Sequence, residues 1–173
     1  MNVISSAGRK VLGVDTSLRS TGVGVVEERG SILRAVRYGV IKNPASRPHT
    51  QCLAHIFSSL REIILEDSPV AAAVEGVFMS RNARTSMILG QARGVVLAAC
   101  ALEKIPVFEY APRRIKQAVV GYGGAHKDQV GQMMMRLLGL AEQPAEDASD
   151  ALAMAVCHLH QLSSPDHMRA EQI

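Results

Sequence analysis

The sequence VLGVDTSLRSTGVGVV, residues 11–26, decides how the rest of the chain is interpreted. Two short apolar runs rich in β-branched residues flank a polar turn of Thr, Ser and Arg, and this pattern predicts a β-hairpin. Asp15 is the only acid in the first run and lies where a buried strand should end. Burying a carboxylate is costly unless a cation or hydrogen bonds meet it. Asp15 is therefore the first candidate ligand.

The composition indicates one globular domain of ordinary size. The chain has 173 residues, of which 47% are hydrophobic and 20% are charged, enough to bury a continuous core. We expect a single domain over residues 1–162 and a flexible C-terminal tail over residues 163–173. Cys52, Cys100 and Cys157 are odd in number and lack C-x-x-C spacing, so we expect buried thiols rather than disulfides or a zinc site.

The charge and hydropathy patterns limit the partners of the chain. No apolar run approaches the roughly 20 residues that span a bilayer, and the first ten residues contain no hydrophobic signal-peptide region. We therefore expect a cytoplasmic protein with no membrane partner. The net charge of +3 permits a polyanion partner without requiring one.

Strand and helix signals alternate beyond the hairpin. Glu27 to Gly30 is typical of a turn, and the apolar runs and helical periodicities that follow predict a third strand, two further strands and five helices. These elements are expected at Ser31–Val40 (strand), Cys52–Asp67 (helix), Val70–Glu75 (strand), Thr85–Glu103 (helix), Pro106–Tyr110 (strand), Pro112–Val120, Lys127–Leu138 and Ala145–Leu162 (helices). The order predicts an α/β domain with a five-stranded mixed sheet that helices cover on both faces.

Four acids form a candidate metal site. Glu75 ends an apolar run in the same way as Asp15, and Asp147 and Asp150 stand three apart at the start of the last helix, on one face. If the two strands are neighbours, their terminal acids converge where α/β sheets bind ligands, and the helix would complete a pair of Mg²⁺ sites. Alternatively, Asp147 caps its helix and Asp150 is simply solvated.

Basic and aromatic residues form candidate nucleic-acid contacts. A loop after Glu75 contains Phe78, Arg81 and Arg84, and a glycine loop at residues 121–124 is flanked by a second basic group. Phe78 could stack on bases or belong to the core. The second group suits phosphate contacts at a helix N-terminus or is a solvated face. Its members are Arg113, Arg114, Lys116 and Lys127.

The predicted helix Thr85–Glu103 carries an unusual number of small residues, namely Gly90, Ala92, Gly94, Ala98 and Ala99. Small side chains allow another backbone to approach closely. That backbone belongs either to the sheet beneath the helix or to a second subunit.

Several of these motifs together resemble the RuvC family of Holliday junction resolvases. The similarity covers about Val11 to His160, in order and with spacing like that of the family. The motifs that carry it are GVD (residues 13–15), TG (21–22), VEGVFM (74–79), LGQARG (89–94), VFEYA (107–111), KQAVVG (116–121) and DASDALA (147–153).

The resemblance implies a ribonuclease-H-like fold, a homodimer, and Mg²⁺-dependent nicking of two opposed strands of a four-way DNA junction. It implies two Mg²⁺ ions per active site, with Mn²⁺ as a substitute, and a RuvA–RuvB branch-migration complex as partner. Residue by residue, it implies catalytic and metal-binding roles for Asp15, Glu75, Asp147 and Asp150, a junction-contacting role for Phe78, and DNA binding by Lys116 and Lys127.

The chain departs from the family pattern at two positions. The family usually has Asp-Pro-Gly where this chain has Asp15-Thr16-Ser17, and usually Glu-Gln where it has Glu75-Gly76. The first departure affects the opening turn, and the second affects a side chain near the cleaved strand.

Two other classes of function compete with a nuclease. An actin-like kinase or ATPase has a similar opening strand and Thr-Gly hairpin, but it needs a second lobe for which this chain is too short. A catalytically silent junction-binding module would keep the acids for structure alone.

Overall fold

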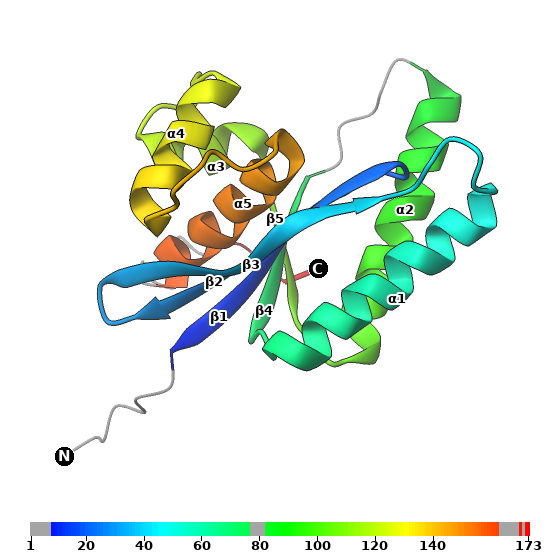
Figure 1. Ribbon diagram of the computed structural model, residues 1–173, viewed down its shortest axis with the longest axis horizontal. Coiled ribbons are helices and arrows are strands. Elements are labelled where there is room, and N and C mark those ends of the chain that lie inside the picture. The colour runs from blue at the N-terminus through cyan, green and yellow to red at the C-terminus, as the bar shows by residue number, and fades with distance from the viewer. Residues whose placement is uncertain (1–7, 77–81, 163–169, 171) are drawn as a thin grey trace.

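The computed structural model describes residues 8–76, 82–162, 170 and 172–173 (Figure 1). Its elements follow the predicted order, and most ends agree with the prediction to within about three residues. The strands are β1 (Arg9–Asp15), β2 (Ser20–Arg29), β3 (Ile32–Lys42), β4 (Ala71–Glu75) and β5 (Val107–Tyr110). The helices are α1 (His49–Asp67), α2 (Ala83–Leu102), α3 (Pro112–Val120), α4 (Lys127–Leu138) and α5 (Glu146–Leu162).

The five strands form one mixed sheet in the order β3-β2-β1-β4-β5. The first three strands are antiparallel neighbours, whereas β4 runs parallel to both β1 and β5. Val14 pairs with Val74, so Asp15 and Glu75 follow paired positions at the same end of two neighbouring strands. The mixed sheet predicted from the sequence is therefore confirmed, and the condition for convergence of the two acids, that their strands are neighbours, is met.

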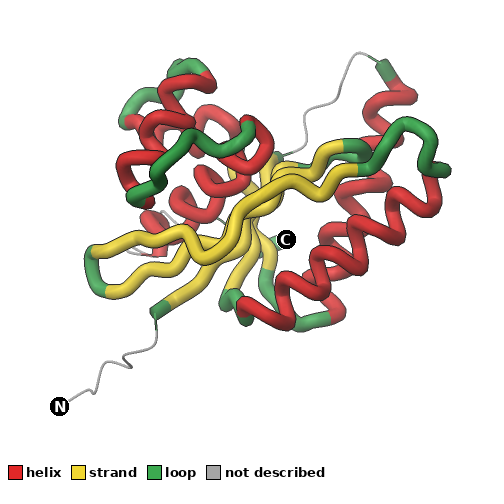
Figure 2. The backbone as a smooth tube through the Cα atoms, viewed as in Figure 1, coloured by secondary structure: helices red, strands yellow, loops and turns green. Residues whose placement is uncertain are grey.

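Helices cover both faces of the sheet, with α1 and α2 on one side and α3, α4 and α5 on the other (Figures 1 and 2). Because successive side chains on a strand point to opposite faces, each strand contributes to two cores. Leu12 and Val74 pack in the core under α1 and α2, while Val11 and Ala73 pack in the core under α5. The same alternation directs Asp15 and Glu75 toward α5.

Two glycines allow the backbone of α5 to lie directly on the sheet. A Cβ atom on Gly13 would fall 1.8 Å from the carbonyl oxygen of Ala151, and one on Gly22 would fall 1.9 Å from that of Asp147. Real side chains do not tolerate such distances, so the helix sits as close as it does because both residues lack a side chain. The buried cysteines Cys52, Cys100 and Cys157 are free thiols, as expected.

The second strand is longer than predicted. Glu27 to Arg29 continue β2 instead of forming a turn, and the reversal falls at Gly30, whose φ of 63° suits glycine. Glu27 is only 4% exposed, and its carboxylate lies 3.1 Å from the Arg29 guanidinium and 3.8 Å from that of Arg34. These cations offset the cost of burying Glu27, a pairing that strand and turn propensities do not reveal.

Helix α2 leaves much of its apolar surface uncovered. Met87 is 67% exposed and Leu102 is 58% exposed, and only 28% of the most apolar stretch of the helix is buried. By length and composition α2 is apolar enough to cross a membrane, contrary to the expectation from the sequence. Among the residues that the structure describes, nothing lies within 4 Å of a Cβ atom built on Gly90 or Gly94, so these two glycines are not needed for packing on the sheet.

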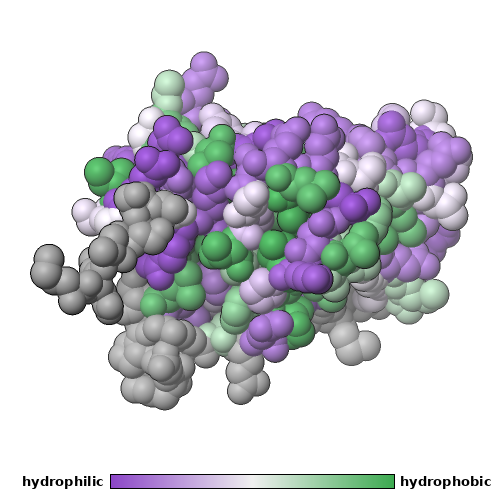
Figure 3. Space-filling view, turned by 90° about the horizontal axis from the view of Figure 1, so that it is seen from below, coloured by the Kyte–Doolittle hydropathy of each residue, from purple (hydrophilic) through white to green (hydrophobic). Residues whose placement is uncertain are grey.

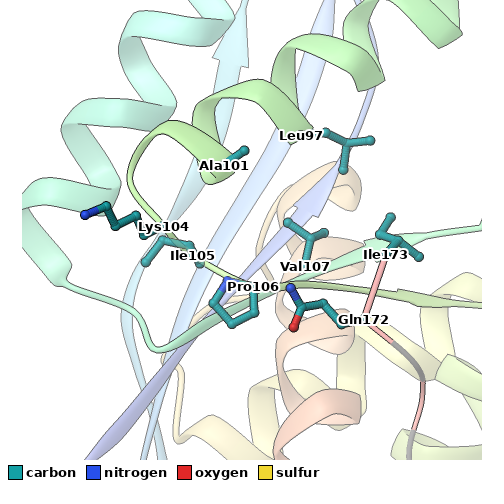
Figure 4. A pocket seen from close by; sticks show the side chains of 8 residues that line it. All are labelled: Leu97, Ala101, Lys104, Ile105, Pro106, Val107, Gln172 and Ile173. Atoms are coloured by element: carbon teal, nitrogen blue, oxygen red, sulfur yellow. The ribbon is translucent and has the colours of Figure 1, made fainter.

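The C-terminal residues return to the free edge of β5. Gln172 pairs with Phe108, and the amide of Ile173 donates to the carbonyl of Val107 at 3.0 Å. A cavity of about 380 Å³ lies between this segment and the last turns of α2, with Leu97, Ala101 and Ile173 around it (Figure 4). On the face that Figure 3 shows, hydrophobic groups alternate with hydrophilic ones.

The contact at Gly13 predicts a large effect of a small substitution. Gly13→Ala should lower the free energy of unfolding by about 1–3 kcal/mol, the usual cost of overpacking a filled interior, because the new methyl group meets the Ala151 carbonyl. Urea denaturation measures the change. Gly39→Ala in β3 is the matched control, since a Cβ atom there has nothing within 4 Å. Equal stabilities for the two variants would contradict the close approach of α5.

Candidate active site

Asp15 and Glu75 line a cavity of about 300 Å³ at one end of the sheet. Their strands are parallel neighbours, so the two carboxylates leave the sheet at the same edge. This is the edge where α/β sheets commonly bind ligands. The other residues around the cavity are one further acid, two lysines and five mainly apolar residues, namely Asp150, Lys116, Lys127, Pro112, Ile115, Val130, Ala153 and Met154.

Helix α5 brings two further acids to the same region. Asp150 lines the cavity, whereas Asp147 lies one turn earlier, where its backbone packs on Gly22. The Ser20 hydroxyl donates a hydrogen bond to the Asp147 carboxylate. The first residue of β2 therefore fixes the orientation of this acid.

The carboxylates perturb one another. The pKa of Asp15 is raised to about 7, mainly by burial and also by the negative charges of Asp150, Glu75 and Asp147. Burial is also the main cause of the raised pKa of Glu75 and of Asp150. Negative charges this close oppose one another's ionisation, so the raised pKa values indicate that too little positive charge lies near the cluster. The four acids chosen from the sequence are thus electrostatically one group.

The donor set suits a hard divalent cation, which prefers carboxylate oxygens. Within the described residues, however, no three acids, histidines or cysteines converge tightly enough to form a ready-made metal site. Asp147 is engaged by Ser20, and the Lys127 ammonium lies 3.6 Å from the Asp150 carboxylate. A cation bound here would therefore compete with a lysine for Asp150.

The predicted basic residues do not all reach the cavity. Lys116 and Lys127 line it, and the Lys127 ammonium also donates to the Glu146 carboxylate, which is the main cause of the raised pKa of Lys127. Arg114 lies over the ring of Tyr110, at 5.8 Å from its centroid. Arg113 packs beside Gly123, outside the cavity lining.

The loop after β4 is described only in part. Arg84 is exposed in the first turn of α2, and Asn82 caps that helix by accepting from the amides of Arg84 and Thr85. Phe78 and Arg81 lie outside the described residues, so their predicted contacts stay predictions.

The opening turn forms without the Pro-Gly pair of the family pattern. The Thr21 hydroxyl donates to the Ser17 carbonyl and accepts from the Ser17 amide at 3.4 Å, so Thr21 closes the turn. Thr21 is fully buried. At the second departure, a side chain on Gly76 would meet the Glu109 carboxylate at 3.1 Å.

Three residues near the acids were missed in the sequence analysis: Ser20, Glu146 and Arg93. No pattern in the sequence around Ser20 or Glu146 indicates a role, because their contacts join distant segments of the chain. Arg93 did give a signal, since it is the only charged residue between Arg84 and Glu103 in an otherwise apolar helix. Its guanidinium donates to the carbonyl of Glu75 at 2.6 Å.

Known proteins share both the sequence and the fold. The family model described as "Crossover junction endodeoxyribonuclease RuvC" matches residues 11–158. The protein of that description from Halorhodospira halophila is 47% identical over 156 residues, covering 90% of this chain and 93% of the relative. The actin-like alternative therefore fails.

Solved structures agree with this assignment. Thermus thermophilus RuvC in complex with a Holliday junction substrate superposes with a TM-score of 0.88 at 31% identity, covering 95% of this chain and 99% of that one. The yeast mitochondrial Holliday junction resolvase Ydc2 shares the fold at a TM-score of 0.67 and 11% identity, over 93% of this chain and 82% of that one. The fold is the ribonuclease-H-like fold of these resolvases.

Both the matched length and the identity are far beyond what a shared fold alone would produce. The chain belongs to the RuvC family of crossover junction endodeoxyribonucleases, the enzymes that resolve Holliday junctions.

Proposed function

We propose that Asp15, Glu75, Asp147 and Asp150 bind two Mg²⁺ ions and that the chain hydrolyses one phosphodiester per active site. The observation that carries this proposal is that Asp15, Glu75 and Asp150 line one cavity at the end of two neighbouring parallel strands. The raised pKa of Asp15 agrees with it, because these buried carboxylates have too little positive charge nearby. Bound divalent ions, Mg²⁺ or Mn²⁺, would acidify a water and stabilise the leaving 3′ oxygen, which leaves 5′-phosphate and 3′-hydroxyl ends.

The chain's own residues have three tasks in this scheme. The two strand-ending acids face α5 and hold their carboxylates at a fixed edge, and Ser20 keeps Asp147 from rotating. The apolar lining from α3, α4 and α5 limits the water that reaches the acids. Lys127 offsets part of the negative charge until substrate binds.

The proposed substrate is a four-way DNA junction, which the related Thermus structure contains. Lys116 and Lys127 would contact phosphates next to the acids, because both line the same cavity. Phe78 would stack on bases at the crossover. We also propose phosphate contacts, weaker than those of the two lysines, for Arg81, Arg84, Arg113 and Arg114.

Two symmetric cuts require two active sites, so we propose a homodimer that matches the two-fold symmetry of the junction. The surface that supports this is α2, where Gly90 and Gly94 face open space and Met87 is exposed. A second copy of the chain would cover the apolar surface of α2 that one subunit leaves exposed. The dimer would act in the cytoplasm with a RuvA–RuvB branch-migration complex.

The proposed metal role predicts that Asp15→Asn abolishes cleavage and leaves junction binding intact or tighter. The substitution removes a metal ligand and also a negative charge that repels phosphates. Nicking and gel-shift assays on one preparation, with and without Mg²⁺, measure both effects on a synthetic four-way junction. Asp128→Asn, which removes an exposed acid outside the cavity lining, is the control. Retained nicking by Asp15→Asn would end the proposal.

The raised pKa of Asp15 predicts a pH-dependent stability. Between the ordinary value of 3.8 and about 7, the folded chain binds more protons than the unfolded chain, so stability falls as pH rises. Asn does not titrate, so in EDTA the thermal midpoint of Asp15→Asn should exceed that of the wild type at pH 8, and the gap should shrink toward pH 4. Each kcal/mol moves the midpoint by about 2–4 °C. If the thermal midpoints of the two proteins change with pH in parallel, the pKa of Asp15 is not the cause of the pH dependence.

The proposed interface predicts that Gly94→Leu shifts the protein toward monomer in analytical ultracentrifugation. A Cβ atom at this exposed position has no described residue within 4 Å, so the fold should tolerate the substitution. Paired incisions on a supercoiled cruciform should then become single nicks. Ala54→Leu, on the exposed side of α1, is the matched control. A Gly94→Leu protein that remains dimeric would place the interface elsewhere.

A further inference from the structure

Arg93 is a buried charge on the opposite side of the sheet from the acids. It lies in the middle of α2, is 9% exposed, and is the only charged residue in that part of the helix. Burying a guanidinium is costly unless its donors are matched, so its partners indicate what it is for.

Both terminal nitrogens of the guanidinium donate hydrogen bonds. One terminal nitrogen, Nη1, donates to the backbone carbonyl of Glu75 at 2.6 Å, and the other, Nη2, donates to the Glu109 carboxylate. Glu109 lies on β5, between Phe108 and Tyr110, whose side chains pack on the α5 side. Glu109 therefore points to the α2 side of the sheet, where it meets Arg93.

The contact with Glu75 falls where the strand ends. Glu75 is the last residue of β4, and the amide of Gly76 donates to the carbonyl of Tyr110 at 2.9 Å. The single peptide group between Glu75 and Gly76 is thus held at both of its polar atoms, the N–H by β5 and the carbonyl by Arg93. Displacements of about 1 Å in an active site are known to cost about 100-fold in rate. The direction of the Glu75 side chain depends on how firmly its backbone is held.

We propose that Arg93 is a positioning residue for the cleavage reaction: from α2, through the carbonyl of Glu75, it fixes the carboxylate of Glu75 for metal binding. This inference rests on the proposed metal role of Glu75. The planar fork of arginine suits the task, because one rigid group reaches a carbonyl and a carboxylate together, which a lysine ammonium does not do.

The test compares Arg93→Met with Arg61→Met. Arg61 on α1 pairs with Glu103 at 2.7 Å, so its loss removes an ion pair of the same kind that touches no acid of the site. Loss of a group that orients a metal ligand typically costs about 10–100-fold in metal affinity or activity. Arg93→Met should therefore raise the Mn²⁺ concentration for half-maximal cleavage, and lower the single-turnover rate at saturating protein, by about tenfold or more.

Three further measurements separate positioning from stability. Mn²⁺ binding, followed by the electron paramagnetic resonance signal of the free ion, should weaken in Arg93→Met, while junction affinity in EDTA should stay within about twofold of wild type. Arg61→Met should keep wild-type metal dependence even if its thermal midpoint falls. Arg93→Lys keeps a cation beside Glu109 for folding and should still need more Mn²⁺ than wild type.

The outcomes are distinguishable. If Arg93→Met, or a folded Arg93→Lys where the first variant does not fold, shows wild-type Mn²⁺ binding and rate, the inference is overturned. A loss of the same size in Arg61→Met would also overturn it. Glu75→Gln is measured in parallel: if it cleaves normally, the proposed metal role of Glu75 fails, and if it is inactive while the Arg93 variants are normal, only the positioning role fails.

Discussion

The contact between the backbone of α5 and the strands β1 and β2 is the constraint on which the site depends. At Gly13 and Gly22 there is no room for even one extra carbon atom. Because the helix lies this close, Asp147 and Asp150 reach the edge at which Asp15 and Glu75 leave the sheet. A helix held further out, at the usual distance set by two layers of side chains, would carry its acids away from the strands. The placement of the four acids of the candidate site is thus a product of packing before it is a product of charge.

The assembled site works against the stability of the fold. Four carboxylates are gathered where burial and mutual repulsion raise the pKa of three of them. Lys127 and Ser20 relieve this only in part, through Asp150 and Asp147 respectively. Natural proteins tolerate such local conflict at functional sites because the surrounding core is stable enough to hold it. Almost the whole length of α5 belongs to that core here, since the helix is buried from Ala148 to Leu159 except for Asp150.

Most of the fold and the four acids could be predicted because their signals are local. An apolar strand that ends on a lone acid is visible within six residues, and Pro112 and Lys127 begin their helices as expected. The extension of β2 was not predicted, because Arg29 and, from the next strand, Arg34 offset the burial of Glu27, and strand and turn propensities do not reveal such pairing. Likewise, the contacts of Ser20 with α5 and of Arg93 with β4 join segments far apart in the chain. The exposure of α2 also escaped prediction, since small residues suit the sheet and a partner equally well.

The raised pKa of Asp15 has a consequence for the proposed binding of cations. Near neutral pH the carboxyl is about half protonated in the metal-free protein, so a cation that binds there must expel a proton. Cation binding and proton binding at Asp15 are thereby linked, because each weakens the other at the same pair of carboxyl oxygens. If the proposed metal role holds, a fall in pH of one unit around neutrality would act on the protein as a dilution of the metal ion. The buried carboxyl would then exchange a proton for a divalent ion.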